Sequence, residues 1–291
     1  MRIGILKGVF SKNKDALLLE KAAQRRGHFI EIISLKDAWL EVENGKVRWI
    51  DKNGGLDRFN IILVRGGGKM FRLQRNFLSW LARRKVIVVD KKFIKGGNFA
   101  DKTFDLSLLV EHGFKTPNFY LFSNEGELKN KAQKLGFPFF LKNKREHRGV
   151  GVFLINSLEE LNEKIKTIED ISDWYLQQKI DFEKDIRVFV IGDEVLGAIE
   201  RIPPKGEYRA NISLGGRAKP FEINYKLKDL SKKAAKLLDC EIAGVDFLLS
   251  RDEAYIIEVN SIPQFYGFMR ATKIDVPQKI IEYLEKIKIY E

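Results

Sequence analysis

Two carboxylates near the C-terminal end of the chain are spaced so that they could bind a metal ion together. Asp246 and Glu258 each lie in an apolar run rich in β-branched and aromatic residues, and a short polar segment, 250–254, separates the two runs. This pattern predicts a β-hairpin. Directly opposed residues of antiparallel strands have their side chains on one face, about 5 Å apart. A loop at the centre of the polar segment would therefore place Leu249 opposite Tyr255 and Asp246 opposite Glu258.

Asn260 adds an amide oxygen to this pair. It lies two residues beyond Glu258, so the two-residue period of a strand puts it on the same face. Opposed like charges between apolar strands cost free energy unless a cation lies between them. A set of oxygen ligands suits Mg²⁺ or Mn²⁺, which proteins commonly share with phosphate oxygens. The alternative is a surface hairpin with solvated acids, but three apolar neighbours leave no clearly wet face: Ile256, Ile257 and Val259.

A basic loop in the middle of the chain could contact an anion. The loop 143–151 joins an expected strand at 139–142 to a second one at 152–155, and it contains Gly149 and Gly151. Glycine allows backbone N–H groups to approach an anion closely. Four basic side chains accompany these glycines: Lys142, Lys144, Arg145 and Arg148. The loop could therefore fold over a polyphosphate, and a solvated hairpin tip is the alternative.

The composition favours a globular protein that binds acidic partners. Of the 291 residues, 44% are hydrophobic and 32% are charged. The chain has neither an apolar run long enough to span a membrane nor the pattern of a signal peptide, so we expect a cytoplasmic protein without a membrane partner. The net charge of +12 points to an acidic partner such as a nucleotide, a nucleic acid or an acidic protein.

Cysteine and histidine are scarce, which limits the chemistry that the chain can perform. A single cysteine, Cys240, excludes an internal disulfide, and its place beside an apolar strand indicates a packed thiol rather than a nucleophile. Three histidines give little material for a His-based metal site or a Ser–His–Asp triad.

The first 90 or so residues alternate strand and helix signals, which predicts a small, mainly parallel α/β domain. Asn44 and Gly45 lie at the centre of an alternating pattern and predict a tight hairpin turn. The run 65–68, Arg-Gly-Gly-Gly, lacks the spacing of a P-loop or a dinucleotide fingerprint, so we interpret it as a turn with Arg65 as a candidate substrate-facing residue. Expected strands cover 2–6, 29–33, 60–64 and 85–89, and expected helices cover 14–26, 72–83, 102–111 and 126–135.

Five stretches carry a resemblance to a known family: Asp101 and Lys102 with Gly113 and Pro117; 137–142 with 149–151; 176–180 with 185–187; 199–201 with 206–211 and 215–216; and 243–246 with 258–260. In this order the chain resembles the ATP-grasp superfamily and, within it, the RimK-like carboxylate–amine (alpha-L-glutamate) ligases. The resemblance extends from about Phe99 to Glu285. It implies an α/β fold in which an N-terminal parallel α/β domain, 1–92, precedes an ATP-grasp domain of two α+β subdomains, 93–291, with an ATP lid at about 113–180.

The resemblance also implies roles for individual residues. Lys102 and Lys142 would contact ATP, and Asp185 would lie near the ribose. One or two Mg²⁺ or Mn²⁺ ions would bridge the β- and γ-phosphates, held by Asp246, Glu258 and Asn260. The adenine edge would be read by the backbone of Gln178, Lys179 and Ile180, and the nucleotide would also contact Arg209, Ala210 and Asn211. Judged without the family, Lys102 would be an exposed residue at a helix start and Asp185 a carboxylate at a hairpin edge.

Three arginines would face the transferred phosphoryl group and the substrate carboxylate by the same resemblance: Arg187, Arg201 and Arg209. The guanidinium fork suits both groups because it binds carboxylate and phosphate through two parallel hydrogen bonds. The alternative is that these arginines are structural and pair with Asp185 or Glu200.

The chain departs from the family pattern at three places. Gln178 replaces the usual carboxylate of the linker, which a backbone contact to adenine tolerates. The phosphate loop has Glu146-His-Arg148 before its glycines instead of small residues. The segment 261–267, Ser-Ile-Pro-Gln-Phe-Tyr-Gly, replaces a small, glycine-rich sequence where the substrate should bind. The substrate is therefore the part of the function that the sequence leaves open.

The activity implied by the resemblance is an ADP-forming ligase reaction without a protein nucleophile. ATP would phosphorylate a carboxylate, and the amine of an amino acid, with glutamate as first choice, would displace phosphate. The acceptor would be a carboxylate on a protein or coenzyme. One alternative is a LysX-like ligase that joins an amino acid to an acidic carrier protein, and another is a basic nucleic-acid-binding protein on an ATP-grasp-like scaffold. A homo-oligomer is compatible with either.

Overall fold

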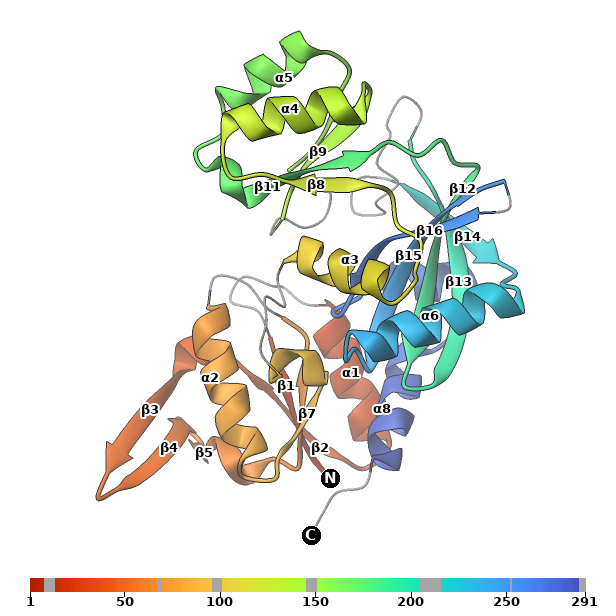
Figure 1. The fold of residues 1–291 in the computed structure, drawn as a ribbon. Coiled ribbons are helices and arrows are strands. Elements are labelled where there is room, and N and C mark those ends of the chain that lie inside the picture. Colours follow the sequence, from red (N-terminus) through yellow and green to blue (C-terminus); the bar gives the residue numbers. More distant parts are fainter. Residues whose placement is uncertain are drawn as a thin grey trace.

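The computed structural model describes residues 1–7, 14–66, 70–95, 101–144, 151–204, 216–251 and 253–287, apart from the side chain of Phe71. Helices and strands alternate in a mixed α/β fold, as predicted. Figure 1 shows an N-terminal sheet at the bottom, a large antiparallel sheet beside it, and a smaller sheet with two helices at the top. Among the described residues, no helix has the length and apolar character to cross a membrane.

The N-terminal sheet is fully parallel and has the strand order β2-β1-β6-β7. Its strands are β1 (Arg2–Leu6), β2 (Phe29–Ile33), β6 (Ile61–Val64) and β7 (Ile87–Val89), and its flanking helices are α1 (Lys14–Arg25) and α2 (Phe71–Ala82). All four residues of β6 are buried. A strand that is covered on both faces reads as a continuous apolar run, so the sequence predicted this parallel sheet correctly.

A hairpin projects from this sheet (Figure 1). Strands β3 (Ala38–Glu43) and β4 (Lys46–Asp51) pair antiparallel, and β5 (Gly54–Gly55) extends the ribbon. Asn44 and Gly45 have φ angles of 50° and 72°. Positive φ at both central residues is what a two-residue turn of this type requires, so the prediction of a hairpin at Asn44-Gly45 is confirmed.

The smaller sheet has the order β10-β9-β11-β8 and carries helices on one face only. Its elements are β8 (Phe119–Leu121), α4 (Glu125–Leu135), β9 (Phe139–Asn143), β10 (Val152–Ile155), α5 (Leu158–Ile165) and β11 (Trp174–Gln178). Leu141 and Leu176 face α4 and α5 in a core of their own. By the alternation of a strand, their neighbours Lys142 and Gln177 point to the opposite face, toward the rest of the molecule.

The large sheet is antiparallel, with the order β14-β13-β12-β15-β16. Its strands are β12 (Lys184–Ile191), β13 (Glu194–Ile202), β14 (Arg217–Phe221), β15 (Ile242–Ser250) and β16 (Glu253–Asn260). One face packs against α3 (Lys102–Glu111) and α6 (Tyr225–Leu237), and Cys240 is buried in this core, as predicted. The other face packs against α7 (Tyr266–Thr272), α8 (Val276–Lys286) and the N-terminal sheet.

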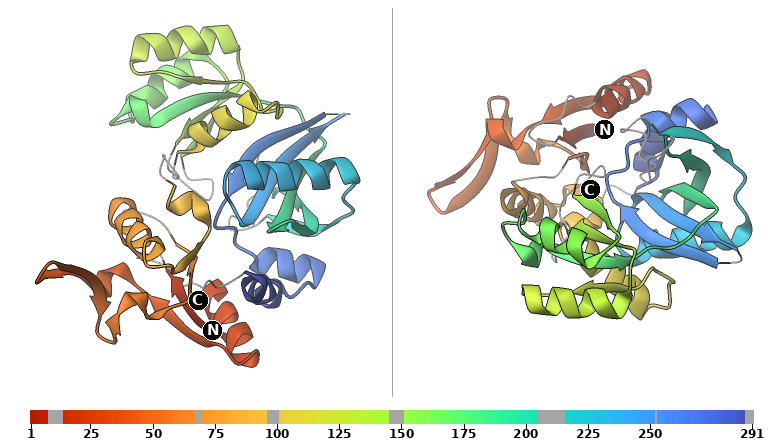
Figure 2. Two further views of the ribbon diagram at one scale, coloured as in Figure 1. Left: turned by 60° about the horizontal axis from the view of Figure 1, so that its bottom comes forward. Right: turned by 90° about the horizontal axis from the view of Figure 1, so that it is seen from above.

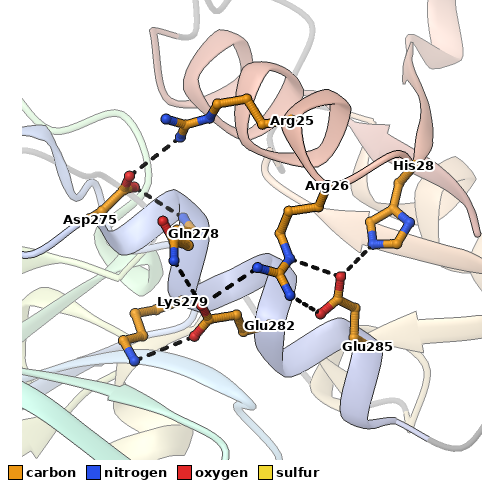
Figure 3. A network of polar contacts seen from close by, with 8 residues as sticks. All are labelled: Arg25, Arg26, His28, Asp275, Gln278, Lys279, Glu282 and Glu285. Carbon is orange, nitrogen blue, oxygen red and sulfur yellow. Dashed lines mark hydrogen bonds and ion pairs between the residues drawn. The ribbon is translucent and has the colours of Figure 1, made fainter.

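Helices α1 and α8, which lie near the two ends of the chain, pack against each other (Figure 2). Figure 3 shows the polar network between them: Arg26 donates two hydrogen bonds to Glu285, of 2.9 and 2.6 Å, and His28 Nε2 lies 2.6 Å from the same carboxylate. Beneath it, one apolar core contains residues of β1, α1, β12 and α8. Because this core includes residues on both sides of the predicted boundary at 92/93, the division into domains, and the lid at about 113–180, stay proposals.

Candidate functional site

The predicted pair of carboxylates is formed in the predicted register, but that register does not extend to the tip of the hairpin. Asp246 of β15 lies opposite Glu258 of β16, as expected. At the tip of the hairpin, however, Leu248 rather than Leu249 lies opposite Tyr255, so the predicted register is wrong there. A β-bulge next to Asp246 adds one residue to β16 and shifts the register back.

The side chain of Asp246 is buried between two guanidiniums. Arg187 donates from Nε and Nη2 to its two carboxylate oxygens, both at 2.7 Å, and Arg201 donates from Nη1 at 2.9 Å. Burial alone would raise the pKa of Asp246, but the charges of Arg187 and Arg201 hold it below its ordinary value. Asp246 is therefore an ionised carboxylate with strong partners, and not a solvated acid on an open face.

Arg201 also binds a third predicted carboxylate of this region, Asp185. Its Nε and Nη2 donate to Asp185 Oδ1 at 2.8 and 2.5 Å. The side chain of Arg201 is 4% exposed, against 16% for Arg187. Arg201 thus bridges two buried carboxylates. Its pairing with Asp185 is the one expected if the arginine has a structural role. Arg187, by contrast, retains access to solvent.

This charged cluster lies on the same sheet face as an apolar core. Along β12, the side chains of Asp185, Arg187, Phe189 and Ile191 alternate onto one face. Phe189 and Ile191 pack under α7 and α8, whereas Asp185 and Arg187 lie beyond this cover. The sheet therefore presents a buried apolar half and a charged half, and the charged half holds the predicted site.

Two predicted lysines approach Glu258 from other elements. Lys102, in the first turn of α3, places Nζ 3.7 Å from Glu258 Oε1, so it is not only an exposed residue at a helix start. Lys142 is half-buried on β9 and donates to Gln177 Oε1. Burial, and then the positive charge of Lys102, lower the pKa of Lys142 to about 8, although Glu258 and Asp185 oppose this shift. The two sheets thus bring positive and negative predicted site residues together.

Two residues that the sequence analysis missed lie beside this site. Lys92 Nζ is 2.5 Å from Asp105 Oδ2, and both side chains are largely buried. Asp105 follows Lys102 by three residues on α3, so the helical period places them on one face. This spacing is the signal that could have identified Asp105. A cavity of about 50 Å³ is lined by both residues together with Lys102, Glu258 and Asn260.

The linker between the small and large sheets contains Gln178, Lys179 and Ile180. The backbone N–H of Gln178 donates to the carbonyl of Asn118 at 2.7 Å, and Gln178 Oε1 accepts from the N–H of Asn118 at 3.2 Å. The Gln178 N–H is therefore part of the sheet and cannot also donate to adenine. Any reading of adenine by N–H donation in this linker must come from Lys179 or Ile180.

Several predicted site residues lie outside the described residues. They are Arg209, Ala210 and Asn211, and the loop residues Arg145, Arg148 and Gly149. Lys144, at the described edge of the basic loop, accepts a backbone hydrogen bond from Lys102 N at 3.4 Å through its carbonyl. The start of α3 therefore contacts the end of β9, which is where the basic loop begins.

The residues present fit a hard divalent cation in type. Glu258 and Asn260 line the same cavity and, with Asp246, supply only oxygen donors, which Mg²⁺ prefers. Across the part of the chain that the structure describes, no three His, Cys, Asp or Glu side chains gather in a cluster that could hold a metal ion. A site here would therefore depend on the amide of Asn260, whose Oδ1 accepts from Ile262 N at 2.9 Å, and on phosphate oxygens.

Solved structures that share this arrangement over nearly the whole chain include ATP-grasp ligases. The ATP-grasp ligase PsnB, complexed with a precursor variant, Mg and ADP, has a TM-score of 0.74 at 16% identity and covers 97% of both chains. D-alanine–D-alanine ligase from Bacillus anthracis, complexed with ATP, has a TM-score of 0.68 at 18% identity and covers 98% of this chain and 96% of that chain. At these identities the likeness defines the fold, which is the ATP-grasp fold.

Within that class, the chain belongs to the RimK-like ATP-grasp family, whose domain matches residues 99–284. A curated relative from Trichodesmium erythraeum (strain IMS101), named probable alpha-L-glutamate ligase, is 30% identical over 98% of this chain and 96% of its own length. The family resemblance expected from the sequence is thus confirmed. The protein is an ATP-grasp ligase.

Proposed function

We propose that the protein is an ADP-forming carboxylate–amine ligase that joins glutamate to a carboxylate-bearing acceptor. One observation carries the proposal: Asp246, Glu258 and Asn260 on two adjoining strands lie opposite Lys102 and Lys142, which come from other elements. Oxygen donors for a cation and lysines for phosphates at one place are what the β- and γ-phosphates of ATP require.

ATP would lie between the two sheets. Lys102 and Lys142 would contact its phosphates, Asp185 would lie on the side of the ribose, and the backbone of the linker 178–180 would read the adenine edge. Mg²⁺, which is present with ADP in the PsnB structure, would be held here by Asp246, Glu258 and Asn260. Bound there, it would neutralise the negative charge that accumulates on the phosphates. Mn²⁺, and a second ion, remain part of this proposal.

The reaction would have two steps. A substrate carboxylate oxygen attacks the γ-phosphorus, an O–P bond forms, and the bond to ADP breaks, which gives an acyl phosphate. The amine nitrogen of the amino acid then attacks the acyl carbon, a C–N bond forms, and phosphate leaves while the nitrogen loses a proton. No protein nucleophile is needed, because catalysis comes from positioning and from charge stabilisation.

Arg187 and Arg201 would have different roles on the substrate side of the site. Arg187 is the more exposed, so we assign to it the contact with the transferred phosphoryl group or the substrate carboxylate. It would exchange its bidentate contact with Asp246 for one with the ligand. Arg201 has its donors directed at Asp185 and Asp246, so its proposed role is to hold both carboxylates in place.

The choice of glutamate rests on the relatives. The curated relative from Trichodesmium erythraeum is named a probable alpha-L-glutamate ligase, and 30% identity over nearly the whole of both chains supports a shared amino-acid substrate. The net charge of +12 supports an acidic acceptor, either a protein or a coenzyme.

The test compares two Glu→Gln substitutions on one strand, β16. Glu258→Gln removes one negative charge from the proposed metal site. Glu253→Gln removes the charge of an exposed carboxylate at the start of β16, which pairs with Lys115 at 2.8 Å. We expect ADP release, measured with glutamate and a panel of acceptors at saturating Mg²⁺, to fall by about 100-fold or more for Glu258→Gln and to change little for Glu253→Gln. Equal activity of the two variants would remove Glu258 from the site, and ADP release with another amino acid but not glutamate would replace the substrate.

A further inference from the structure

The segment that follows Asn260 is held by the N-terminal sheet and not only by the sheet that carries Asn260. Arg65, directly after β6, donates from Nη2 to the carbonyl of Pro263 at 2.6 Å. Asp15, in the first turn of α1, accepts from the N–H of Phe265 at 3.3 Å. These two contacts join residues that are 198 and 250 positions apart in the chain. Arg65 was expected to face a substrate, and this expectation is wrong for its guanidinium, which lies against the 263–265 backbone.

The two polar contacts are made by a buried ion pair. The side chains of Arg65 and Asp15 are 1% and 7% exposed, and Arg65 Nη2 lies 3.7 Å from Asp15 Oδ2. The guanidinium also lies 5.4 Å from the ring centroid of Phe265. Burial raises the pKa of Asp15 and lowers that of Arg65, so burial disfavours the charged form of each group. A buried pair is weak as a source of stability, which makes a role beyond stability worth testing.

The held segment touches the reaction centre. Pro263 Cβ lies 3.1 Å from the point where a Cβ on Gly244 would be, and Arg187 Nε lies 3.5 Å from the same point. Gly244 is the cross-strand partner of Asn260, and Asn260 Oδ1 accepts from Ile262 N. The segment therefore passes over β15 at the one place where glycine leaves room, between Asn260 and the guanidinium that binds Asp246.

We propose that Arg65 and Asp15 are positioning residues for the ligase reaction, which act by holding the segment 261–265 against Gly244. In this position the segment fixes the side-chain amide of Asn260 through Ile262 and limits the space in which Arg187 can move. The N-terminal sheet thereby sets the geometry of a site whose ligands all lie elsewhere. The inference rests on the proposed function, because that function assigns Asn260 to the metal and Arg187 to the substrate side.

A purely structural ion pair makes a different prediction, and the chain offers a matched control. Arg58 lies before β6 just as Arg65 lies after it, and its Nη2 donates to Glu31 and Asp51 at 2.7 and 2.8 Å. Arg58→Lys and Arg65→Lys both keep a positive charge and both lose the fork that reaches two acceptors. If Arg65 only joined two parts of the molecule, the two variants would differ in stability at most.

The experiment measures kcat and KM for ATP and for the acceptor, together with thermal unfolding, in wild type, Arg58→Lys and Arg65→Lys. We expect both variants to unfold at lower temperature. Arg65→Lys should lower kcat by about tenfold to 100-fold with KM for ATP within about twofold of wild type, whereas Arg58→Lys should keep wild-type kcat. Asp15→Asn, which retains an oxygen for Phe265 N–H, should lower kcat less than Arg65→Lys.

Wild-type kcat in folded Arg65→Lys and Asp15→Asn would overturn the proposal. If both variants fail to fold, hydrogen exchange of the unmutated protein decides instead: the amides of 261–265 should exchange as slowly as those of β15, and fast exchange would show that the segment is not held. Exchange does not depend on turnover. Absence of ADP release by the wild-type protein would therefore count against the proposed function, while slow exchange would still support the clamp.

Discussion

If Lys142 contacts a phosphate of ATP, as proposed above, its lowered pKa should make ATP binding dependent on pH in a defined direction. In the free protein, burial and the charge of Lys102 lower the pKa of Lys142 to about 8. A phosphate beside Lys142 would favour the charged form and raise its pKa toward the ordinary value of 10.5 or above. Above pH 8 we therefore expect binding of ATP to be accompanied by uptake of a proton, and the affinity for ATP to fall as the pH rises.

The size of this effect follows from the two pKa values. With a free pKa of about 8 and a bound pKa of about 10.5, the dissociation constant of ATP should rise by about eightfold between pH 7.5 and pH 9. Close to one proton should be taken up per ATP at pH 9. Arg stays protonated throughout this range, so Lys142→Arg should bind with a nearly flat pH profile.

Titration calorimetry in two buffers of different ionisation enthalpy measures both quantities. The reasoning would be refuted by a wild-type affinity that is constant from pH 7.5 to pH 9, because Lys142 would then be either unperturbed or distant from phosphate. A pH dependence that persists unchanged in Lys142→Arg would assign the titration to another group.

Two further changes test buried charges. Arg201→Ala should lower the free energy of unfolding by about 3–5 kcal/mol, because it leaves the buried carboxylates of Asp185 and Asp246 without a shared partner; urea denaturation beside the exposed control Arg217→Ala checks this, and near-equal stabilities would contradict it. Asp90 is fully buried, and burial and the charge of Glu241 raise its pKa well above the ordinary value. Its contribution to stability therefore declines as the pH rises from the ordinary pKa of an aspartate to the raised pKa of Asp90 in the folded protein. Asp90→Asn, which keeps an acceptor for Ile242 N, should therefore unfold at higher temperature than wild type near pH 9 and differ little near pH 4, as thermal scans at both pH values can show.

Local patterns in the sequence were sufficient for most of the elements near the site. The helix predicted at 102–111 has those bounds, and the turn at Asn44-Gly45 has the positive φ angles that its residues favour. Both features depend on neighbours within a few positions, so periodicity and turn chemistry identify them. The pairing of Asp246 with Glu258 was also predicted, although through a register that holds only on one side of the bulge.

The contacts that decide the state of the site could not be predicted in the same way. Asp246 was recognised as a carboxylate opposite Glu258, but its guanidinium partners come from β12, beside β15, and from β13, one strand further on. Only the order of strands in the sheet brings them together. Arg65 reaches a carbonyl 198 residues away. A turn motif predicts where a chain bends, and it contains no information about which distant backbone will pack against it.

A charge and its surroundings differ in how well they can be predicted, because the residue types determine the charges and only the fold determines what surrounds them. Lys142 was predicted to contact phosphate because it ends a strand beside a glycine loop. Its lowered pKa, by contrast, results from burial of its side chain and from the approach of Lys102 on α3, neither of which is visible in the local sequence.

The bulge in β16 has a practical consequence for protein engineering. Because the extra residue lies between the hairpin tip and Glu258, the tip can change in length without moving Glu258 away from Asp246. Deletion of Ile257 would even restore an unbroken ladder with the same two residues opposed. The tip around Arg251 is therefore a suitable place to insert an affinity tag or a fluorescent label without entering the reaction centre.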